Sequence, residues 1–516
     1  MLLVASLAIV VLNLRPDVER NFLSWLTAGI VILTAMLEFF WLVFLSRLRW
    51  RTRLISVALV LVAFGLFRVL LKVDGTVDGR GLPRFVWKWT RHAERPLIAA
   101  TNAPLAALTN LAVLLPGSAD VPQFFGPNRD GVVRNANLAH DWNTVAPKQL
   151  WRKPVGAGWS AFAVVNGLAY TQEQRGENEC VTCYSLSQGE LIWVHSNPVH
   201  FFQWQGGDGP RATPTVSGGR VYAIGATGIL DCLDAATGKL IWTRDVLVEN
   251  KLPNLTWGVS DSPLVFDDKV VVTGGQTSGP ALLAYNNATG QELWRSGTDK
   301  ASYASPVLAT LAGKRMVLSA NAASLTAHDP ATGEILLNYA WGDDKWPKAA
   351  QPVVLDHDRV FLSAGYGVGC VLLEVKPGAD GKLVATQLWK NLRLKTQFNS
   401  VAVREGFFYG LDDGLLACVE VATGDRKWKD GRYGSGQSLL VDDLVIVQNE
   451  NGAIALAEAK PEAFKELGTI SALSAKTWNH PTLAGKYLLV RNSEEMACYE
   501  LPVQTKEPAV QAVPAH

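Results

Sequence analysis

The chain has 516 residues, of which 48% are hydrophobic and 18% are charged, and its formal net charge is +1. This length exceeds that of a typical single domain. The balanced charge supplies no global field of the kind that attracts nucleic acid, so we expect no nucleic-acid partner.

Residues 1–72 are predicted to form a transmembrane region. Residues 22–45 are almost uncharged, with Glu38 as the exception, and residues 54–71 carry one charge near their end. Both stretches reach the roughly 17–20 apolar residues that a helix needs to cross a bilayer. Residues 1–14 are apolar but short, and they form either a further span or a surface segment, because they lack the basic start and the cleavage site of a signal peptide.

The charges around these spans predict their orientation. Residues 47–53 carry four arginines in one short loop, and such a cluster marks the cytoplasmic side. Residues 15–20 balance their charges and can lie outside. The second span then ends on the outer side of a bacterial inner membrane, so the rest of the chain is expected in the periplasm or another extracytoplasmic space.

Two features oppose this orientation. A basic stretch follows the second span, with Arg80, Arg84, Lys88, Arg91 and Arg95. Residues 97–116 carry no charge, and if they crossed the membrane the rest of the chain would be cytoplasmic. We interpret them as an Ala-rich linker, because their Asn, Pro and Thr residues make a poor span.

Residues 73–120 are predicted to be a juxtamembrane segment and linker. Residues 83–89 interleave Trp and Phe with Arg and Lys, a pattern that favours lipid headgroups, so the bilayer is an expected partner. The sequence Phe-Gly-Pro-Asn-Arg-Asp-Gly follows at residues 125–131. We interpret it as a turn that seals the entry to the next domain, in preference to a binding motif.

One sequence cassette recurs through the remainder of the chain. In residues 234–242, two short strands flank a tight turn in which Gly238 can take a positive φ. Further copies, some degraded, occupy residues 187–193, 288–294, 331–339, 381–389, 422–428 and 458–467. Their terminal anchors, in most copies Trp, are 39 to 52 residues apart. This period is typical of β-propellers, in which each repeat supplies four strands.

A second element keeps the same period. Before each cassette, a small or polar residue, often followed by Pro, precedes two apolar strands. Eight units result, beginning near Ala161, Thr213, Ser262, Ser305, Gln351, Ser400, Gln437 and His480. The last unit has three strands of its own, and the orphan strand at residues 149–152 is predicted to complete it and close the ring.

We therefore predict an all-β, eight-bladed propeller over residues 121–501, preceded by an α-helical transmembrane region. The tail, residues 502–516, is rich in Pro and Ala and is predicted to be disordered.

The Ala-x-Thr-Gly-x-x-x-Trp cassette resembles the tryptophan-docking repeat of pyrroloquinoline-quinone (PQQ) dehydrogenases. It is similarly found in BamB-like propellers, which share the fold without the cofactor. The resemblance covers roughly residues 120–501, and residues 125–131 resemble the lead-in motif of membrane-anchored PQQ-like repeat proteins. The resemblance is highly specific for the fold and only weakly specific for the function.

The PQQ dehydrogenases imply a set of site residues that this chain does not visibly supply. They hold calcium with Glu, Asn and Asp, use an Asp base, place a Trp under the quinone, and usually carry a disulfide between adjacent cysteines. The six cysteines here are not adjacent: Cys180, Cys183, Cys232, Cys370, Cys418 and Cys498. Cys180 and Cys183 have metal-like spacing but should point to opposite sides of a strand, and Cys183, Cys232, Cys418 and Cys498 fall at equivalent third-strand positions that predict burial.

Acidic pairs at residues 343–344 and 412–413 could hold a hard cation, but such pairs in turns are more often only solvated. No catalytic residue and no metal ligand is therefore assigned. No cofactor is expected under the binding interpretation, and PQQ with calcium is expected under the dehydrogenase interpretation.

Aromatic residues precede the predicted first strands, which line the axial channel. They could ring one mouth of this channel, with polar residues from nearby loops, and a concave mouth of this composition is a candidate binding site. The candidates are Trp159, Arg175, Asp208, Arg211, Trp257, Tyr303, Trp346, Phe398, Arg432, Tyr433, Trp478 and Arg491, with Asn451 close by. The alternative is that the aromatic side chains pack between blades.

Two functions fit these observations. The first is a membrane-anchored, extracytoplasmic propeller that binds an envelope protein or ligand without catalysis. The second is a membrane-bound PQQ dehydrogenase that oxidises an alcohol or a sugar. The missing dehydrogenase residues favour the first.

Overall fold

The structure is a computed structural model, and it describes residues 2–15, 18–90, 119–379 and 381–504. The predicted linker at residues 97–116 and the tail from residue 505 onward lie outside the described residues.

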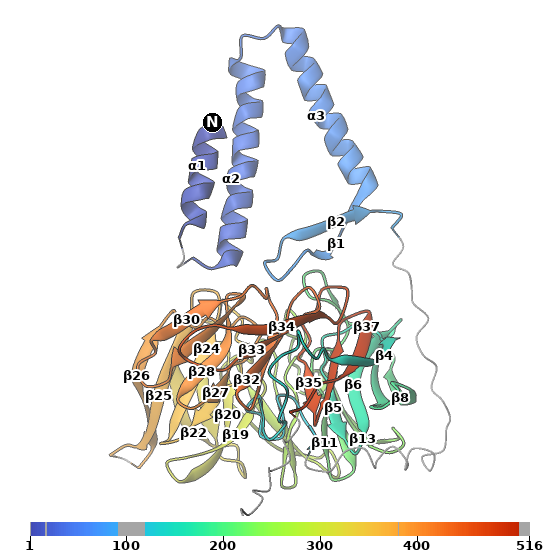
Figure 1. Cartoon of the computed structure of the whole chain (residues 1–516), viewed down its shortest axis with the longest axis vertical. Coiled ribbons are helices and arrows are strands. Elements are labelled where there is room, and N and C mark those ends of the chain that lie inside the picture. Colours follow the sequence, from blue (N-terminus) through green and yellow to red (C-terminus); the bar gives the residue numbers. More distant parts are fainter. Residues whose placement is uncertain (1, 16–17, 91–118, 380, 505–516) are drawn as a thin grey trace, which may run out of the picture.

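The N-terminal region contains two long apolar helices (Figure 1). Helix α2 (Arg20–Phe40) continues into the π-helical turn η1 (Trp41–Leu45), and helix α3 is Trp50–Leu70. Both helices are long and apolar enough to cross a membrane. The shorter helix α1 (Leu2–Asn13) contacts α2.

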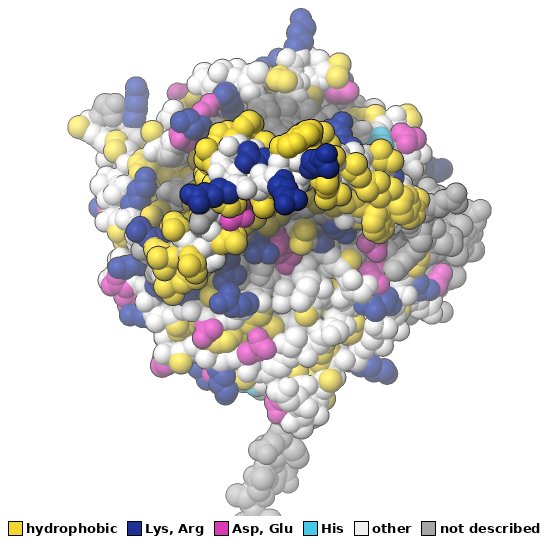
Figure 2. All heavy atoms as spheres, turned by 90° about the horizontal axis from the view of Figure 1, so that it is seen from above, with side chains coloured by type: hydrophobic (Ala, Val, Ile, Leu, Met, Phe, Trp, Pro, Cys, Tyr) yellow, Lys and Arg dark blue, Asp and Glu magenta, His cyan; other side chains and the backbone are white. Residues whose placement is uncertain are grey.

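The end at which α2 and α3 are joined is basic. Seen from this end, Lys and Arg side chains gather over the apolar helices (Figure 2). Residues 47–53, with their four arginines, lie at this join, away from the propeller.

A β-hairpin that the sequence analysis did not predict follows α3 directly. Strand β1 (Leu71–Thr76) pairs with β2 (Pro83–Trp87). The Lys88 backbone N–H donates to the Leu70 carbonyl at 2.8 Å, and the Phe67 and Phe85 rings are 5.0 Å apart. These contacts fix the hairpin to the end of α3.

The rest of the described chain is an eight-bladed β-propeller, as predicted. Blades 1 to 7 each contain four antiparallel strands in sequential order, and in blade 7 the strand β3 adds a fifth in parallel. Blade 1 consists of β5 (Ala163–Val165), β6 (Leu168–Arg175), β7 (Asn178–Ser185) and β8 (Leu191–Asn197), and blade 2 of β11 (Thr215–Ser217), β12 (Arg220–Ile224), β13 (Ile229–Asp234) and β14 (Leu240–Asp245). Blade 3 consists of β15 (Leu264–Phe266), β16 (Lys269–Thr273), β17 (Leu282–Asn286) and β18 (Glu292–Ser296), and blade 4 of β19 (Val307–Leu311), β20 (Lys314–Ala320), β21 (Ser324–His328) and β22 (Ile335–Ala340).

Blades 5 to 7 follow the same plan. Blade 5 consists of β23 (Val353–Leu355), β24 (Arg359–Ala364), β25 (Gly369–Pro377) and β26 (Leu383–Asn391). Blade 6 consists of β27 (Ala402–Arg404), β28 (Phe407–Asp412), β29 (Leu415–Glu420) and β30 (Arg426–Asp430). Blade 7 contains β31 (Gln437–Val441), β32 (Leu444–Gln448), β33 (Ala453–Glu458) and β34 (Glu466–Ser471). Between blades lie the short strands β9 (Phe202–Gln203) and β10 (Gly207–Asp208) and the helix α4 (Val246–Glu249).

Blade 8 is closed by a strand from the front of the propeller, as predicted. Its own strands are β35 (Thr482–Ala484), β36 (Tyr487–Arg491) and β37 (Glu495–Glu500), and β4 (Lys148–Pro154) pairs antiparallel with β37. Trp151 lies opposite Cys498 in this pairing. The first and last parts of the propeller therefore share one sheet.

The recurring cassette joins neighbouring blades through a tryptophan dock. The Trp193 indole N–H of blade 1 donates to the Ala235 carbonyl of blade 2 at 3.0 Å. Gly238, at φ 70°, lies beneath the same ring, where an added Cβ would come within 2.5 Å of a ring carbon. The glycine is therefore required both by its backbone conformation and by the approach of the indole.

The same dock recurs at four further junctions. In each, an indole N–H donates to a carbonyl of the next blade, and a glycine with positive φ lies under the ring. The pairs are Trp151 with Gly189, Trp242 with Gly290, Trp294 with Gly333, and Trp389 with Gly424. Trp428 makes the hydrogen bond of the dock without the glycine contact: its indole N–H donates to the Lys460 carbonyl.

Two blades lack a tryptophan at this position. The strand registers place Leu337 at this position in blade 4 and Gly468 in blade 7, so the predicted anchors Tyr339 and Leu467 are displaced from it by two residues and one residue. Beside blade 7, Trp142 from the segment before β4 supplies the missing bulk: it is buried, its backbone N–H donates to the Leu467 carbonyl, and it packs on Gly468.

Residues at the predicted blade starts link neighbouring blades near the axis. The Thr213 hydroxyl accepts from the Ala161 backbone N–H at 3.0 Å, the Ser262 hydroxyl from Thr213 at 2.9 Å, and the Ser305 hydroxyl from Ser262 at 2.9 Å. These bonds explain the recurrence of Ser and Thr at this place in the repeat.

Residues at the end of the described chain differ from the predicted disordered tail. Leu138 bridges Val503, and the Gln504 backbone N–H donates to the Asn137 carbonyl at 2.8 Å. Residues 502–504 are thus ordered against the segment that leads into β4, because that segment offers them backbone partners.

The cysteines are buried and unpaired among themselves. Cys183, Cys232, Cys418 and Cys498 lie on the third strands of their blades, each opposite a docking Trp. Their prediction as small core residues is confirmed.

The dock makes a prediction about stability. We expect Gly238→Ala to destabilise the protein more than Gly313→Ala, although both replace a glycine with φ near 70°. At Gly313 nothing lies within 4 Å of an added Cβ, so its cost is backbone strain of about 1–2 kcal/mol. At Gly238 overpacking adds about 1–3 kcal/mol. Denaturant unfolding in detergent measures the difference, and equal losses would contradict the dock.

Candidate functional site

The loops that follow each second strand and the connections between blades lie at the same end of the ring, because the strands are antiparallel. We call this end of the ring the mouth. The seven predicted aromatic residues all lie in the connections between blades, just before a first strand or, for Trp159, before blade 1. The mouth is also the end that the N-terminal helices approach (Figure 1).

The aromatic candidates form groups at the mouth. The Trp159 and Trp478 rings are 4.8 Å apart, and Phe398 lies 5.1 Å from Trp478. Trp257 and Tyr303 form a second, T-shaped pair at 5.5 Å.

Their exposure varies. Trp346 is exposed at 38%, and Tyr433 is buried at 3% with its hydroxyl donating to Glu466. The other five are partly exposed. The groups thus lie partly open at the mouth, and their binding role remains a prediction.

Three of the five polar candidates, Arg211, Asp208 and Arg432, lie in different surroundings. The Arg211 guanidinium donates to the carbonyls of Gly207 and Trp257 at 2.8 and 3.0 Å, and burial lowers its pKa to about 10. Asp208 contacts His200 at 2.8 Å, and Arg432 is exposed.

The remaining two polar candidates, Arg175 and Arg491, make contacts inside the propeller. Arg175 pairs with Glu173 at 2.9 Å. Arg491 is fully buried and donates to the carbonyls of Gly156 and Gln172 at 2.8 Å. Arg491 therefore supports the first and last blades from inside and presents no charge at the surface.

Lys476 is a mouth residue that sequence reasoning missed. Its ammonium lies 4.2 Å from the centre of the Trp478 ring and 5.7 Å from that of Trp159, a cation–π arrangement. Burial lowers the pKa of Lys476 to about 8, and Arg84 adds to this effect. The sequence signal that could have identified Lys476 as a mouth residue is its position two residues before Trp478 in the repeat.

The start of α2 docks on the mouth through two carboxylates. Glu19 accepts from the backbone N–H groups of Tyr366 and Gly367 at 2.7 and 2.6 Å, and Asp413 accepts from the Arg20 N–H at 2.9 Å. Burial raises the pKa of both carboxyl groups. Because the first N–H groups of a helix lack internal partners, Asp413 satisfies one of them.

Aromatic contacts extend this docking. Phe22 of α2 lies 5.7 Å from Trp346 in a T-shaped arrangement, and Trp346 stacks on Tyr366 at 5.5 Å. One predicted mouth residue, Trp346, therefore contacts helix α2 of the same chain.

Asp412, the other member of the acidic pair at residues 412–413, forms ion pairs with lysines of the chain itself. Asp412 is fully buried beside Lys395 at 2.8 Å and Lys429 at 2.7 Å. Asp344 of the other acidic pair contacts Lys300. Within the described ranges, no three His, Cys, Asp or Glu residues gather as a metal-binding group.

The axial channel is occupied by the segment that precedes β4: Val121 bridges Val164 near the end of the first strand β5, and Arg129 reaches the starts of other first strands. The Arg129 guanidinium is buried and donates to the carbonyls of Ser262 and Pro306 at 3.2 and 3.1 Å, and to Pro263. Burial lowers its pKa to about 9. The Gln351 amide donates to the Arg129 carbonyl at 3.4 Å. The 125–131 motif thus acts as the seal that its sequence predicted.

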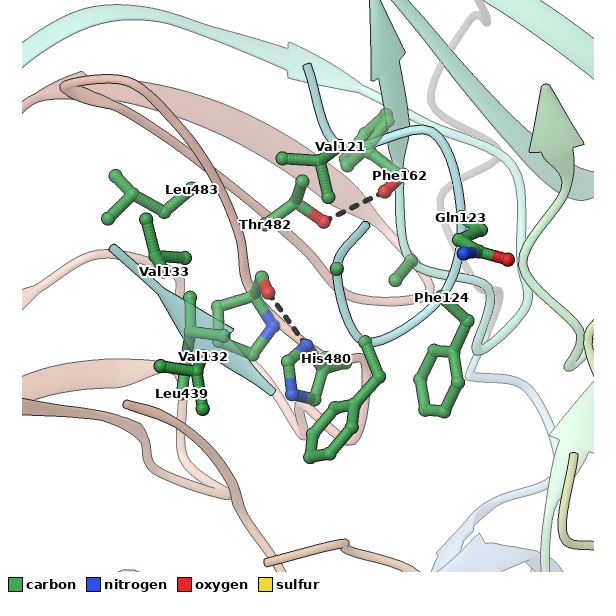
Figure 3. Close-up of a pocket in the computed structure, with 14 residues that line it drawn as sticks. Val121, Gln123, Phe124, Val132, Val133, Phe162, Leu439, His480, Thr482 and Leu483 are labelled. Atoms are coloured by element: carbon green, nitrogen blue, oxygen red, sulfur yellow. Dashed lines mark hydrogen bonds between the residues drawn. The ribbon is translucent and has the colours of Figure 1, made fainter. Parts of the chain in front are cut away.

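A small pocket lies beside this seal (Figure 3). Phe124 and Phe125 approach the His480 ring at 5.6 and 5.1 Å, and burial lowers the pKa of His480 to about 4. Strand β3 (Val132–Val133) closes the other side by pairing with β31. The pocket is lined mainly by apolar side chains and is part of the seal.

The residues present do not fit a quinone site of the dehydrogenase type. No two cysteines are adjacent in the sequence, and all six are free. The buried Asp261 accepts from Thr273 at 2.6 and 2.9 Å, and Arg129 occupies the channel. We therefore derive no step through PQQ.

Comparisons with known proteins agree with this fold. A family model described as outer membrane protein assembly factor BamB matches residues 177–430. The quinohemoprotein alcohol dehydrogenase ADH-IIG of Pseudomonas putida is 25% identical over 368 residues, covering 62% of this chain and 49% of that protein. BamB of Xanthomonas campestris is 34% identical over 103 residues, covering 20% of this chain and 25% of that protein. The chain thus spans half or less of these relatives.

Solved structures show the same fold at low sequence identity. BamB from Moraxella catarrhalis superposes with a TM-score of 0.50 at 14% identity, covering 70% of this chain and 99% of that one. Quinohemoprotein alcohol dehydrogenase from Comamonas testosteroni superposes with a TM-score of 0.55 at 12% identity, covering 80% and 86%.

The environment of Lys476 predicts a pH effect. Because its folded-state pKa, about 8, lies below the ordinary value of 10.5, the unfolded state binds the extra proton between these pH values. The free energy of unfolding should therefore rise through this window, by about 1–3 kcal/mol from this group. Lys476→Met should remove this part of the rise. Parallel pH profiles for the two proteins would show that Lys476 titrates normally.

Proposed function

We propose that the chain is a membrane-anchored, extracytoplasmic binding module. The premise is that it is a PQQ-like β-propeller repeat protein with two apolar N-terminal helices. Its partner would be an envelope protein or ligand held at the mouth, and its role would involve no catalysis. The observation that carries this proposal is that mouth residues already hold polypeptide: Glu19 and the start of α2 are bound by blades 5 and 6.

The charge distribution supports the proposed location. The four arginines of residues 47–53 lie at the end of the helices remote from the propeller. By the positive-inside tendency this end is cytoplasmic, and the propeller then lies on the periplasmic side of a bacterial inner membrane.

A dehydrogenase is the second candidate, and the similarity to ADH-IIG favours it. Against it stand the separate cysteines and the filled channel. Fold and partial similarity do not transfer an activity without its site residues.

The location can be tested by cysteine labelling. We expect Thr237→Cys, in an exposed turn of the propeller, to react with a membrane-impermeant maleimide on intact spheroplasts. Leu48→Cys, in the arginine-rich loop, should react only after lysis. The six native cysteines are buried, so background labelling should be low. The reverse pattern would place the propeller in the cytoplasm.

The absence of catalysis can be tested by reconstitution. We expect the purified full chain, incubated with PQQ and Ca²⁺, to show no dye-linked oxidation of primary alcohols or sugars. A quinoprotein dehydrogenase assayed in the same detergent is the control. Stoichiometric PQQ binding with turnover would overturn the binding-module proposal.

A further inference from the structure

The tip of the β1–β2 hairpin enters the mouth next to the aromatic group formed by Trp159 and Trp478. Thr76 accepts a hydrogen bond from Lys476 at 3.3 Å and donates to the Gln205 carbonyl at 3.3 Å. The contacts come from connections of blades 1 and 8, which are far from the hairpin in sequence. The hairpin therefore spans part of the ring at the mouth (Figure 1).

Glu450 is the centre of this contact. One carboxylate oxygen accepts from the Gly79 backbone N–H at 2.6 Å and from the Trp478 indole N–H at 2.7 Å. The other oxygen accepts from the Ser435 backbone N–H at 3.0 Å. Hydrogen bonds to an ionised acceptor are stronger than neutral ones. We call Glu450, Trp478 and Ser435 the Glu450 cradle.

The cradle requires a glycine at the tip for reasons of space. A Cβ added to Gly79 would overlap the Ser435 side chain. Gly79 does not have a positive φ, unlike Gly75 and Gly81 of the same hairpin. The backbone conformation alone would therefore accept other residues at position 79, and the close approach to Ser435 is what excludes them.

The tip is a preformed turn. The Arg80 guanidinium contacts the Asp78 carboxylate at 2.7 Å, and the Arg80 backbone N–H donates to the same side chain at 3.0 Å. The hydrogen bond to Asp78 raises the pKa of Arg80, and the negative charge of Glu450 adds to this effect. The cradle thus receives a glycine N–H flanked by a cation.

The hairpin is weakly held elsewhere. Val73, Phe85 and Trp87 on one face are 46% to 50% exposed. A two-stranded hairpin alone is marginally stable in water. Its seating therefore depends on α3 and on a few polar contacts at the tip, and another ligand of the same chemistry could replace it.

We propose that the Glu450 cradle is a recognition site for a glycine-bearing β-turn of a partner protein, and that the hairpin tip occupies it in the absence of that partner. This inference rests on the proposed function and names the partner class of the mouth. A turn is favoured over a small molecule because the cradle binds a backbone N–H and fits a residue without a side chain. Tethering gives the tip an effective concentration near millimolar, so a partner turn must bind tightly enough to exceed it.

The test uses the full chain in lipid nanodiscs and a labelled, disulfide-cyclised synthetic peptide of residues 71–87 as the probe. Gly79→Leu in the protein should eject its own tip by overlap with Ser435. We expect the peptide to bind this variant at least tenfold more tightly than the wild type. Adding Glu450→Ala to Gly79→Leu should abolish the gain.

Val77→Leu is the matched control, because Val77 is 57% exposed at the same turn and its replacement should leave the tip seated. Peptide binding should then equal that of the wild type. Equal binding by the wild type and Gly79→Leu, no binding by either, or binding that survives Glu450→Ala would each overturn the proposal.

A second measurement does not depend on ejecting the tip. A fluorophore on Val77→Cys, whose position is exposed at the same turn, should report the seated tip of the otherwise native chain, and excess unlabelled peptide should increase its mobility by displacing the tip. A mobility that saturating peptide leaves unchanged would contradict the site. Failure here would leave the maleimide labelling pattern untouched, so the loss of this inference and the loss of the proposed function are distinguishable.

Discussion

The fold depends on the contact between one tryptophan and one glycine at successive blade junctions. The indole crosses from the fourth strand of one blade to the tight turn of the next, donates its N–H to a carbonyl there, and covers a glycine whose missing side chain leaves room for the ring. Trp151 makes this contact between blade 8 and blade 1. The ring is therefore closed by the same interaction that builds it, with a strand contributed from before blade 1.

This constraint explains why the fold could be predicted from sequence. The Trp and Gly positions recur at a fixed period and must coincide with strand ends, so Trp193 and Gly238 each identify a blade. Trp151 stood alone before the first unit, and only an incomplete last blade could use it. The blade starts were visible for a related reason, since Ser262 and Ser305 bond the preceding blade. Where the repeat degrades, as at Gly468, the substitute Trp142 came from a segment without a period and was not foreseen.

The candidate site was less predictable. Position in the repeat placed the aromatic residues at one end of the ring, but it could not show that Arg491 is buried or that Lys476 lies over Trp478. The hairpin after α3 was missed because its strands are short and its apolar residues resemble a membrane-interface pattern. Contacts between Gly79 and Glu450, separated by 371 residues, leave no local signal in a single sequence.

The arrangement places the mouth in direct contact with helix α2 and with the β1–β2 hairpin. Glu19 and α2 are held by blades 5 and 6, and the hairpin by blades 7 and 8 and the connection after blade 1. Arg129 lies inside the channel, on carbonyls just before the first strands of two blades. Helix α2 and the hairpin therefore cover part of the mouth.

The closed ring is tested most directly by amide hydrogen exchange of the full chain in nanodiscs. If β4 is an integral strand of blade 8, the amides of Trp151 and its neighbours should exchange as slowly as those of β37, and Trp151→Ala should accelerate both strands together. Rapid exchange across β4 in the wild type, with β37 still protected, would contradict a ring closed by this strand.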